Sequence, residues 1–248
     1  MVQSVTRTLE LLKILGSKQK KWAVAELSEI SGLAPSTVHR LLMTLKEHRF
    51  VAQAPDSSLY YLGPALISLG MAANNYLDIR KSAMPIMEEL AAKSEEDAYL
   101  AIADGSYGIF VERVPGPHPL KVVGPVLIRV PLHCGAIRKV LLANSSETFI
   151  AKFLEGNLDR YTENTIIDSR QLAGQLAQIK RDGFALTVSE YIKEAVGIGA
   201  PVYDHYGDVV ASLGIIGPTM RITAEKYPDL IGQVKHYAQQ LSFALGYK

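Results

Sequence analysis

The chain has 248 residues, of which 48% are hydrophobic and 21% charged; this composition is ordinary for a soluble globular protein, and the length suits two domains. A net charge of +1 is too small for the overall charge of the protein to attract nucleic acid by itself. The single cysteine, Cys134, excludes an intrachain disulfide framework or a cysteine zinc site. The polar N-terminus lacks the apolar region of a signal peptide, and no stretch approaches eighteen uninterrupted apolar residues. We therefore expect a cytoplasmic protein without a membrane partner.

The charges are unevenly distributed along the chain. Residues 1–62 hold eight Lys and Arg against five Asp and Glu, a net +3, which leaves −2 for the remainder. This excess favours contact with nucleic acid near the N-terminus. The basic loop at residues 17–21 fits either phosphate contact or a solvated turn, and both interpretations stay open.

The first part of the chain reads as a helix-turn-helix. Apolar residues at positions 5, 9, 12 and 15 predict a first helix with Ser4 as its N-cap and Gly16 as its end. A second helix is expected through residues 25–30, and Gly32 turns the chain into a third helix that begins at Pro35. Two short helices joined by a glycine turn are typical of this motif.

The third helix is the candidate DNA-recognition helix. Its apolar residues at positions 38, 41, 42 and 45 recur at helical spacing and predict a buried stripe. The remaining side chains offer small hydrogen-bonding groups and one guanidinium, which suit a DNA groove; they are Ser36, Thr37, Arg40 and Thr44, with His39 on the flank. A solvated helix face of no function is the alternative.

Residues 50–53 and 59–62 predict two strands joined by a turn at residues 54–58. Three helices and such a hairpin make a winged helix-turn-helix over residues 1–63. We count Ser57 and Ser58, in the turn of the wing, among the DNA-contact candidates. The apolar residues of the following segment, 64–84, predict a linker helix with a dimer surface; packing within the same subunit is the alternative.

Residues 85–248 predict an α+β domain. We expect a helix at residues 85–91, one over residues 172–182 and a closing helix over residues 230–245. Six strands are expected at residues 98–102, 108–114, 120–123, 184–188, 196–202 and 209–216. Strands joined in hairpins, with helices between and at the two ends, predict an antiparallel sheet covered on one side.

The sequence gives little support to an enzyme. Cys134 lies beside His133, but adjacency in sequence does not make a catalytic pair. Glu190 and Glu194 are four residues apart and could face together if the segment were helical, but such pairs are usually solvated. The histidines lack metal-ligand spacing and no phosphate-binding glycine loop is present, so we expect no metal and no cofactor.

Several motifs in order resemble the IclR family of bacterial transcriptional regulators. They are Val2-Gln3-Ser4-Val5, residues 33–42, Tyr61-Leu62-Gly63, Pro131-Leu132-His133 with residues 139–143, residues 200–204 with 207–211, and Gly217-Pro218. The resemblance covers essentially the whole chain. It implies a GAF-like effector domain and pairing of subunits through the DNA-binding domains, so we expect a homodimer or a dimer of dimers on double-stranded operator DNA, where two recognition helices read two half-sites.

A small-molecule site is expected where Gly135 opens a helix, because free backbone N–H groups at a helix start favour a carboxylate. The resemblance implicates further residues on this segment and on facing strands: Val122, Gly135, Ala136, Ile137, Glu190, Gly197, Gly214 and Ile216. The chain departs from the family where Arg138 replaces a usual glycine and where Gly214 and Ile216 replace hydroxyl side chains. We therefore expect a mainly apolar organic acid, preferably aromatic, with Arg129 or Arg138 as its charge partner.

The sequence thus predicts an effector-responsive, DNA-binding transcriptional regulator. A ligand-binding sensor whose helix-turn-helix serves only protein pairing is the alternative.

Overall fold

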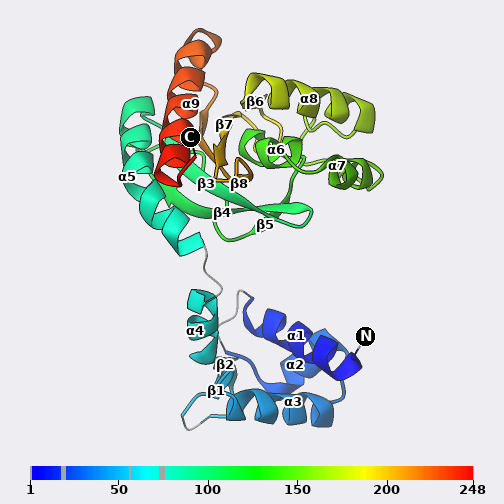
Figure 1. Cartoon of the computed structure of the whole chain (residues 1–248). Coiled ribbons are helices and arrows are strands. Elements are labelled where there is room, and N and C mark those ends of the chain that lie inside the picture. Colours follow the sequence, from blue (N-terminus) through cyan, green and yellow to red (C-terminus); the bar gives the residue numbers. More distant parts are fainter. Residues whose placement is uncertain (1, 18–20, 56, 73–75, 248) are drawn as a thin grey trace. The chain divides into compact units, whose positions relative to one another are not determined.

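The computed structural model describes residues 2–17, 21–55, 57–72 and 76–247, with the backbone alone for 70–72 and 76–78. The chain divides into two compact units, Met1–Leu77 and Asp78–Lys248 (Figure 1). Residues 18–20 of the expected basic loop and residue 56 of the expected wing turn lie outside the described residues.

The N-terminal unit is a winged helix-turn-helix, as predicted. Its elements are α1 (Gln3–Leu15), α2 (Val24–Ser31), α3 (Pro35–Glu47), β1 (Val51–Gln53), β2 (Tyr60–Leu62) and α4 (Ala65–Ala72). Gly32, with φ 67°, ends α2, and Pro35 occupies the first turn of α3. The expected N-cap Ser4 is wrong: α1 begins at Gln3 after Val2, whose carbonyl accepts the Thr6 N–H, so Ser4 lies inside the helix.

The core of this unit confirms the buried apolar stripe that was predicted for α3. Val38, Leu42 and Leu45 are buried, and Leu41 is partly buried. Trp22 adds a contact that the spacing of apolar residues did not predict. Its backbone N–H and carbonyl both pair with Tyr60 at 2.8 Å, which fastens the segment before α2 to the wing.

The expected linker helix at residues 64–84 includes residues 73–75, which lie outside the described residues; on either side of them the structure has α4 and α5 (Tyr76–Ser94). Helix α5 continues through Pro85, where a new helix was expected. Proline within a helix removes one backbone hydrogen bond. Ala83, Met87 and Leu90 are fully buried against the sheet on both sides of Pro85, and this packing offsets the loss.

The C-terminal unit is built on a six-stranded antiparallel sheet in the order β5-β4-β3-β8-β7-β6. The strands are β3 (Asp97–Asp104), β4 (Tyr107–Val114), β5 (Arg129–Pro131), β6 (Ala185–Val188), β7 (Ala195–Tyr203) and β8 (Val209–Pro218). The antiparallel pairs of consecutive strands β3–β4 and β7–β8 confirm the predicted hairpin pattern.

Helices cover both faces of this sheet, so the expectation of one covered side is wrong (Figure 1). One face packs against α5 and α9 (Tyr227–Ala244), which follows the short 3₁₀ helix η1 (Ala224–Lys226); the other packs against α6 (Ala136–Ala143), α7 (Glu147–Leu154) and α8 (Ser169–Asp182). On β3, Leu100 belongs to the first core, and the neighbouring Tyr99 belongs to the second. Both alternating sets are apolar, and therefore both faces must be buried.

The third expected strand, at residues 120–123, is also wrong. Residues 121–125 have no regular secondary structure, and the strand that pairs with β4 on the side away from β3 is β5. Prolines at positions 115, 117, 119 and 125 remove N–H donors from this stretch and prevent it from joining the sheet. Helix α7, capped by Ser146, was not predicted. Within the described part of the chain, no helix is long and apolar enough to cross a membrane.

Candidate functional site

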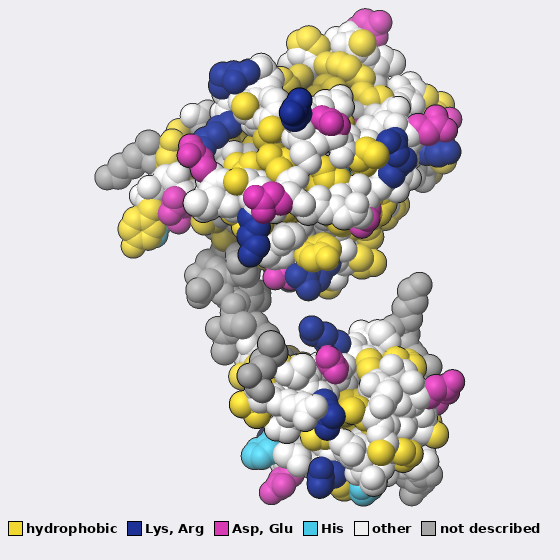
Figure 2. Space-filling model, turned by 90° about the vertical axis from the view of Figure 1, so that its right-hand side faces the viewer, with side chains coloured by type: hydrophobic (Ala, Val, Ile, Leu, Met, Phe, Trp, Pro, Cys, Tyr) yellow, Lys and Arg dark blue, Asp and Glu magenta, His cyan; other side chains and the backbone are white. Residues whose placement is uncertain are grey.

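The predicted DNA-contact residues lie on the outside of the N-terminal unit. Ser36, His39, Arg40 and Thr44 are exposed on α3, and Thr37 is partly buried. Ser57 and Ser58 are exposed in the wing turn. The Arg40 guanidinium forms no hydrogen bond or ion pair with any described residue and is therefore available to a partner. Lys and Arg side chains on the visible face of this unit lie among acidic ones, so its positive excess is modest (Figure 2).

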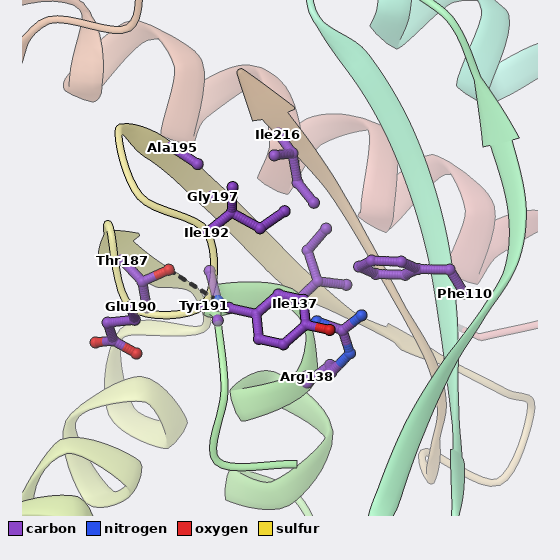
Figure 3. Close-up of a pocket in the computed structure, with 12 residues that line it drawn as sticks. Phe110, Ile137, Arg138, Thr187, Glu190, Tyr191, Ile192, Ala195, Gly197 and Ile216 are labelled. Atoms are coloured by element: carbon purple, nitrogen blue, oxygen red, sulfur yellow. Dashed lines mark hydrogen bonds between the residues drawn. The ribbon is translucent and has the colours of Figure 1, made fainter. Parts of the chain in front are cut away.

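The C-terminal unit contains a half-open pocket, with a cavity volume of about 40 Å³, between α6, the β6–β7 loop and strands β4, β7 and β8 (Figure 3). Its walls are mainly apolar and aromatic, with one guanidinium among them. The lining residues are Phe110, Gly135, Ala136, Ile137, Arg138, Thr187, Glu190, Tyr191, Ile192, Ala195, Gly197 and Ile216.

The start of α6 is held against β6. Gly135, with φ 77°, is the N-cap, a conformation that favours glycine. The Ala136 N–H donates a hydrogen bond of 3.0 Å to Thr187 Oγ1 (Figure 3). This N–H group was expected to be free for a carboxylate; because Thr187 Oγ1 already accepts its hydrogen bond, that expectation is wrong for Ala136.

Six of the eight predicted effector residues line this pocket, and Val122 and Gly214 do not. Val122 lies in the proline-rich stretch before β5. At Gly214, an added Cβ would lie 2.1 Å from the Ile198 carbonyl oxygen and 2.6 Å from Ile137 Cγ1. Ile137 therefore fills the space that a side chain from position 214 would need.

Sequence reasoning missed the aromatic walls of the pocket and left the charge partner open. Phe110 and Tyr191 gave no separate signal, although Tyr191 directly follows the predicted Glu190. Of the two candidate cations, Arg138 lines the pocket. Arg129 lies elsewhere on the surface, where it pairs with Asp104 at 3.0 Å.

Two consecutive basic residues of α6 are buried, and they differ in their partners. Lys139 forms an ion pair with Glu190 and donates a hydrogen bond of 2.6 Å to Gln175 Oε1. Burial lowers the pKa of Lys139, and Glu190 opposes this shift. Burial also lowers the pKa of Arg138, to about 10, so its guanidinium stays charged at neutral pH.

The neighbouring His133 and Cys134 do not form a nucleophilic pair. Both are buried, and burial raises the pKa of the Cys134 thiol to about 12, which leaves it protonated at neutral pH. His133 Nε2 lies 2.9 Å from the Asp159 carbonyl oxygen and is engaged there. No group of three His, Cys, Asp or Glu residues suited to a metal was found in the described ranges.

A winged helix-turn-helix with an outward recognition helix, together with an α+β unit that contains a half-open, mainly apolar pocket, defines a DNA-binding regulator with a separate sensor domain. Residues 4–55 match the model of the IclR helix-turn-helix domain, and residues 71–243 match that of the bacterial transcriptional regulator IclR C-terminal domain. The chain belongs to the IclR family. It is a transcriptional regulator and not an enzyme, and the alternative of a helix-turn-helix used only for protein pairing is not supported.

Similar proteins of known role or structure extend over the whole chain. The regulator XynR of Escherichia coli is 30% identical, covering 100% of this chain and 98% of XynR, and KdgR of the same organism is 31% identical over 99% and 94%. The crystal structure of the Thermotoga maritima IclR has a TM-score of 0.76 and 26% identity, with complete coverage of both chains. An IclR homologue from Microbacterium hydrocarbonoxydans, solved with 4-hydroxybenzoate, has a TM-score of 0.86 and 22% identity over 98% and 99%.

Proposed function

We propose that this regulator changes its binding of operator DNA when a small, mainly apolar organic acid occupies the pocket of the C-terminal unit. The single observation that supports this most is the pocket lining, in which apolar walls surround one buried guanidinium. Apolar surface stabilises a bound ligand by about 25 cal/mol per Å² removed from water. A two- or three-carbon oxo-acid offers little such surface, whereas an aromatic acid offers an entire ring.

The Microbacterium relative shows that this fold accommodates 4-hydroxybenzoate in at least one protein. At 22% identity, that likeness concerns the fold, and the choice of an aromatic acid here rests on Phe110, Tyr191, Ile192 and Ile216.

Calorimetric titration of the full-length protein tests the choice of ligand. Benzoate and phenylacetate are compared with glyoxylate and pyruvate, in the natural protein and in Ile216→Ser. We expect the aromatic acids to bind more tightly and Ile216→Ser to reduce that preference; Ile128→Ser, at an exposed position, serves as a control. Tight binding of the small acids without the aromatic ones, or an unchanged preference in Ile216→Ser, contradicts the proposal.

For the DNA side, we propose that α3 enters the major groove with Ser36, Thr37, His39, Arg40 and Thr44, and that Ser57 and Ser58 of the wing contact the backbone. Two half-sites require two such units, and we propose a dimer, or a dimer of dimers, acting in the cytoplasm. The division into a DNA-binding domain at 1–63, a linker at 64–84 and an effector domain at 85–248 is part of the same proposal, although α5 continues across residue 84.

A further inference from the structure

Arg138 is a buried cation that lacks an anion. Its side chain is 2% exposed, and Nε and Nη2 are buried without a hydrogen-bond partner. No carboxylate of the described residues forms an ion pair with it, in contrast to the adjacent Lys139, which has Glu190. An unpaired buried charge is costly, and proteins retain one mainly where something else compensates it.

The surroundings of Arg138 are shaped to hold a flat guanidinium. Its Cζ lies 4.1 Å from the centre of the Phe110 ring and 5.0 Å from that of Tyr191 (Figure 3). Gly108 leaves room for the aliphatic stem, because a Cβ there would lie 2.9 Å from Arg138 Cγ. Aromatic faces attract a cation but supply no hydrogen-bond acceptor in the plane of the guanidinium. The edge formed by Nε and Nη2 thus stays unsatisfied.

The Tyr191 wall belongs to a fixed loop. The hydroxyl groups of Thr162 and Thr165 donate hydrogen bonds of 2.6 Å to the carbonyl oxygens of Ser189 and Glu190 respectively. The Glu190 side chain is also bound, by Lys139. The loop therefore presents Tyr191 to Arg138 while its own acidic group is neutralised elsewhere.

We propose that Arg138 is the specificity-determining anchor of this pocket, where its Nε and Nη2 take the carboxylate of the effector in a bidentate pair. This rests on the proposed function and replaces the helix-start N–H groups as the anion site. A carboxylate matches the Nε–Nη2 edge of a guanidinium with two parallel, charge-assisted hydrogen bonds. Because both nitrogens are shielded from solvent, binding requires Arg138 or a wall residue to move.

The test compares acids with their neutral amides in the full-length protein. Benzoate against benzamide, and phenylacetate against phenylacetamide, are titrated into the natural protein, Arg138→Gln, Arg138→Lys and Arg129→Gln. Arg129 is a matched control, because it also lies over an aromatic ring, with Cζ 4.4 Å from the centre of Tyr107, but outside the pocket. We expect Arg138→Gln to weaken acid binding about 10- to 100-fold, with little effect on the amides.

Arg138→Lys keeps the positive charge but lacks the two parallel N–H donors of a guanidinium, so it is expected to bind the acids more tightly than Arg138→Gln and less tightly than the natural protein. Arg129→Gln is expected to bind like the natural protein. Thermal unfolding checks folding: removal of an unpaired buried charge should leave Tm unchanged or higher, whereas a purely structural guanidinium predicts a lower Tm.

If the natural protein binds none of the acids, the proposed function fails. If it binds them in preference to the amides and Arg138→Gln keeps that preference, the proposed function stands and the assignment of Arg138 is overturned.

Discussion

Lys139 on α6 and Glu190 in the β6–β7 loop form a buried ion pair, in which the lysine is fully shielded from solvent. Gln175 on α8 accepts a second hydrogen bond from the same ammonium group. The ion pair and this hydrogen bond therefore tie α6, the β6–β7 loop and α8 together. The ion pair also occupies a carboxylate that would otherwise repel an anionic ligand.

Breaking this pair should destabilise the C-terminal unit. Lys139→Met leaves Glu190 buried without its cation and is expected to lower the free energy of unfolding by about 3–5 kcal/mol. The double variant Lys139→Met/Glu190→Leu removes both charges and should recover most of that loss. Urea unfolding followed by circular dichroism measures both; equal stability of Lys139→Met and the natural protein would refute the prediction.

The stability of the same unit should depend on pH through His133. Burial lowers the pKa of His133, and Nδ1 is buried without a partner. The unfolded chain, with an ordinary histidine pKa of about 6.5, then binds the proton more readily than the folded one. Stability is therefore expected to fall as the pH drops below about 6.5.

Urea unfolding at a series of pH values between 7 and 5 tests this expectation. His133→Gln, which does not titrate, should flatten the dependence, and His205→Gln, at an exposed position, should not. The same slope in all three proteins would exclude His133 as the cause.

How far the sequence predicts this molecule depends on which interactions decide each feature. Helix α3 follows from the spacing of Val38, Leu42 and Leu45, because a 3.6-residue period is local information. The direction of Arg138 does not follow in this way. It depends on Gly108 and Phe110 of a distant strand and on Tyr191 of another loop, and sequence spacing does not report such contacts.

The errors have similar causes. Three of the four residues at 120–123 are apolar and suit a strand locally, but the surrounding prolines leave β4 to pair with β5. Burial of both faces of the sheet was readable in principle from β3, where the consecutive residues Tyr99 and Leu100 are both apolar and point to opposite faces.

On the DNA side, Arg40 is the first residue to test. Arg40→Ala is expected to weaken specific operator binding by about 1–3 kcal/mol if the guanidinium grips a base edge, and Ser36→Ala should cost less. Operator titrations at fixed salt concentration, on variants with natural circular dichroism, provide the measurement. If the operator affinity of Arg40→Ala equals that of the natural protein, Arg40 does not contact the bases of the operator.

Assembly can be tested on α1. Val5 and Leu9 share one face of α1 and are 54% and 53% exposed; Val2, just before the helix, is 65% exposed. We expect at least a dimer at micromolar concentration, and a weaker one in Leu9→Glu. Ile30→Glu, which places the same charge at an exposed position of α2, is the control. Sedimentation of the natural protein as a 27.1 kDa monomer throughout this range would contradict the dimer.

The measurement that tests the central claim most directly is operator affinity with and without an acid that binds the pocket. An operator is first selected from genomic fragments, and its dissociation constant is measured for the full-length protein across a salt series. A saturating aromatic acid is expected to change that constant at least tenfold, in either direction, and the change should be lost in Arg138→Gln. An acid that binds calorimetrically and leaves operator affinity unaltered at every salt concentration would show that the pocket does not control DNA binding.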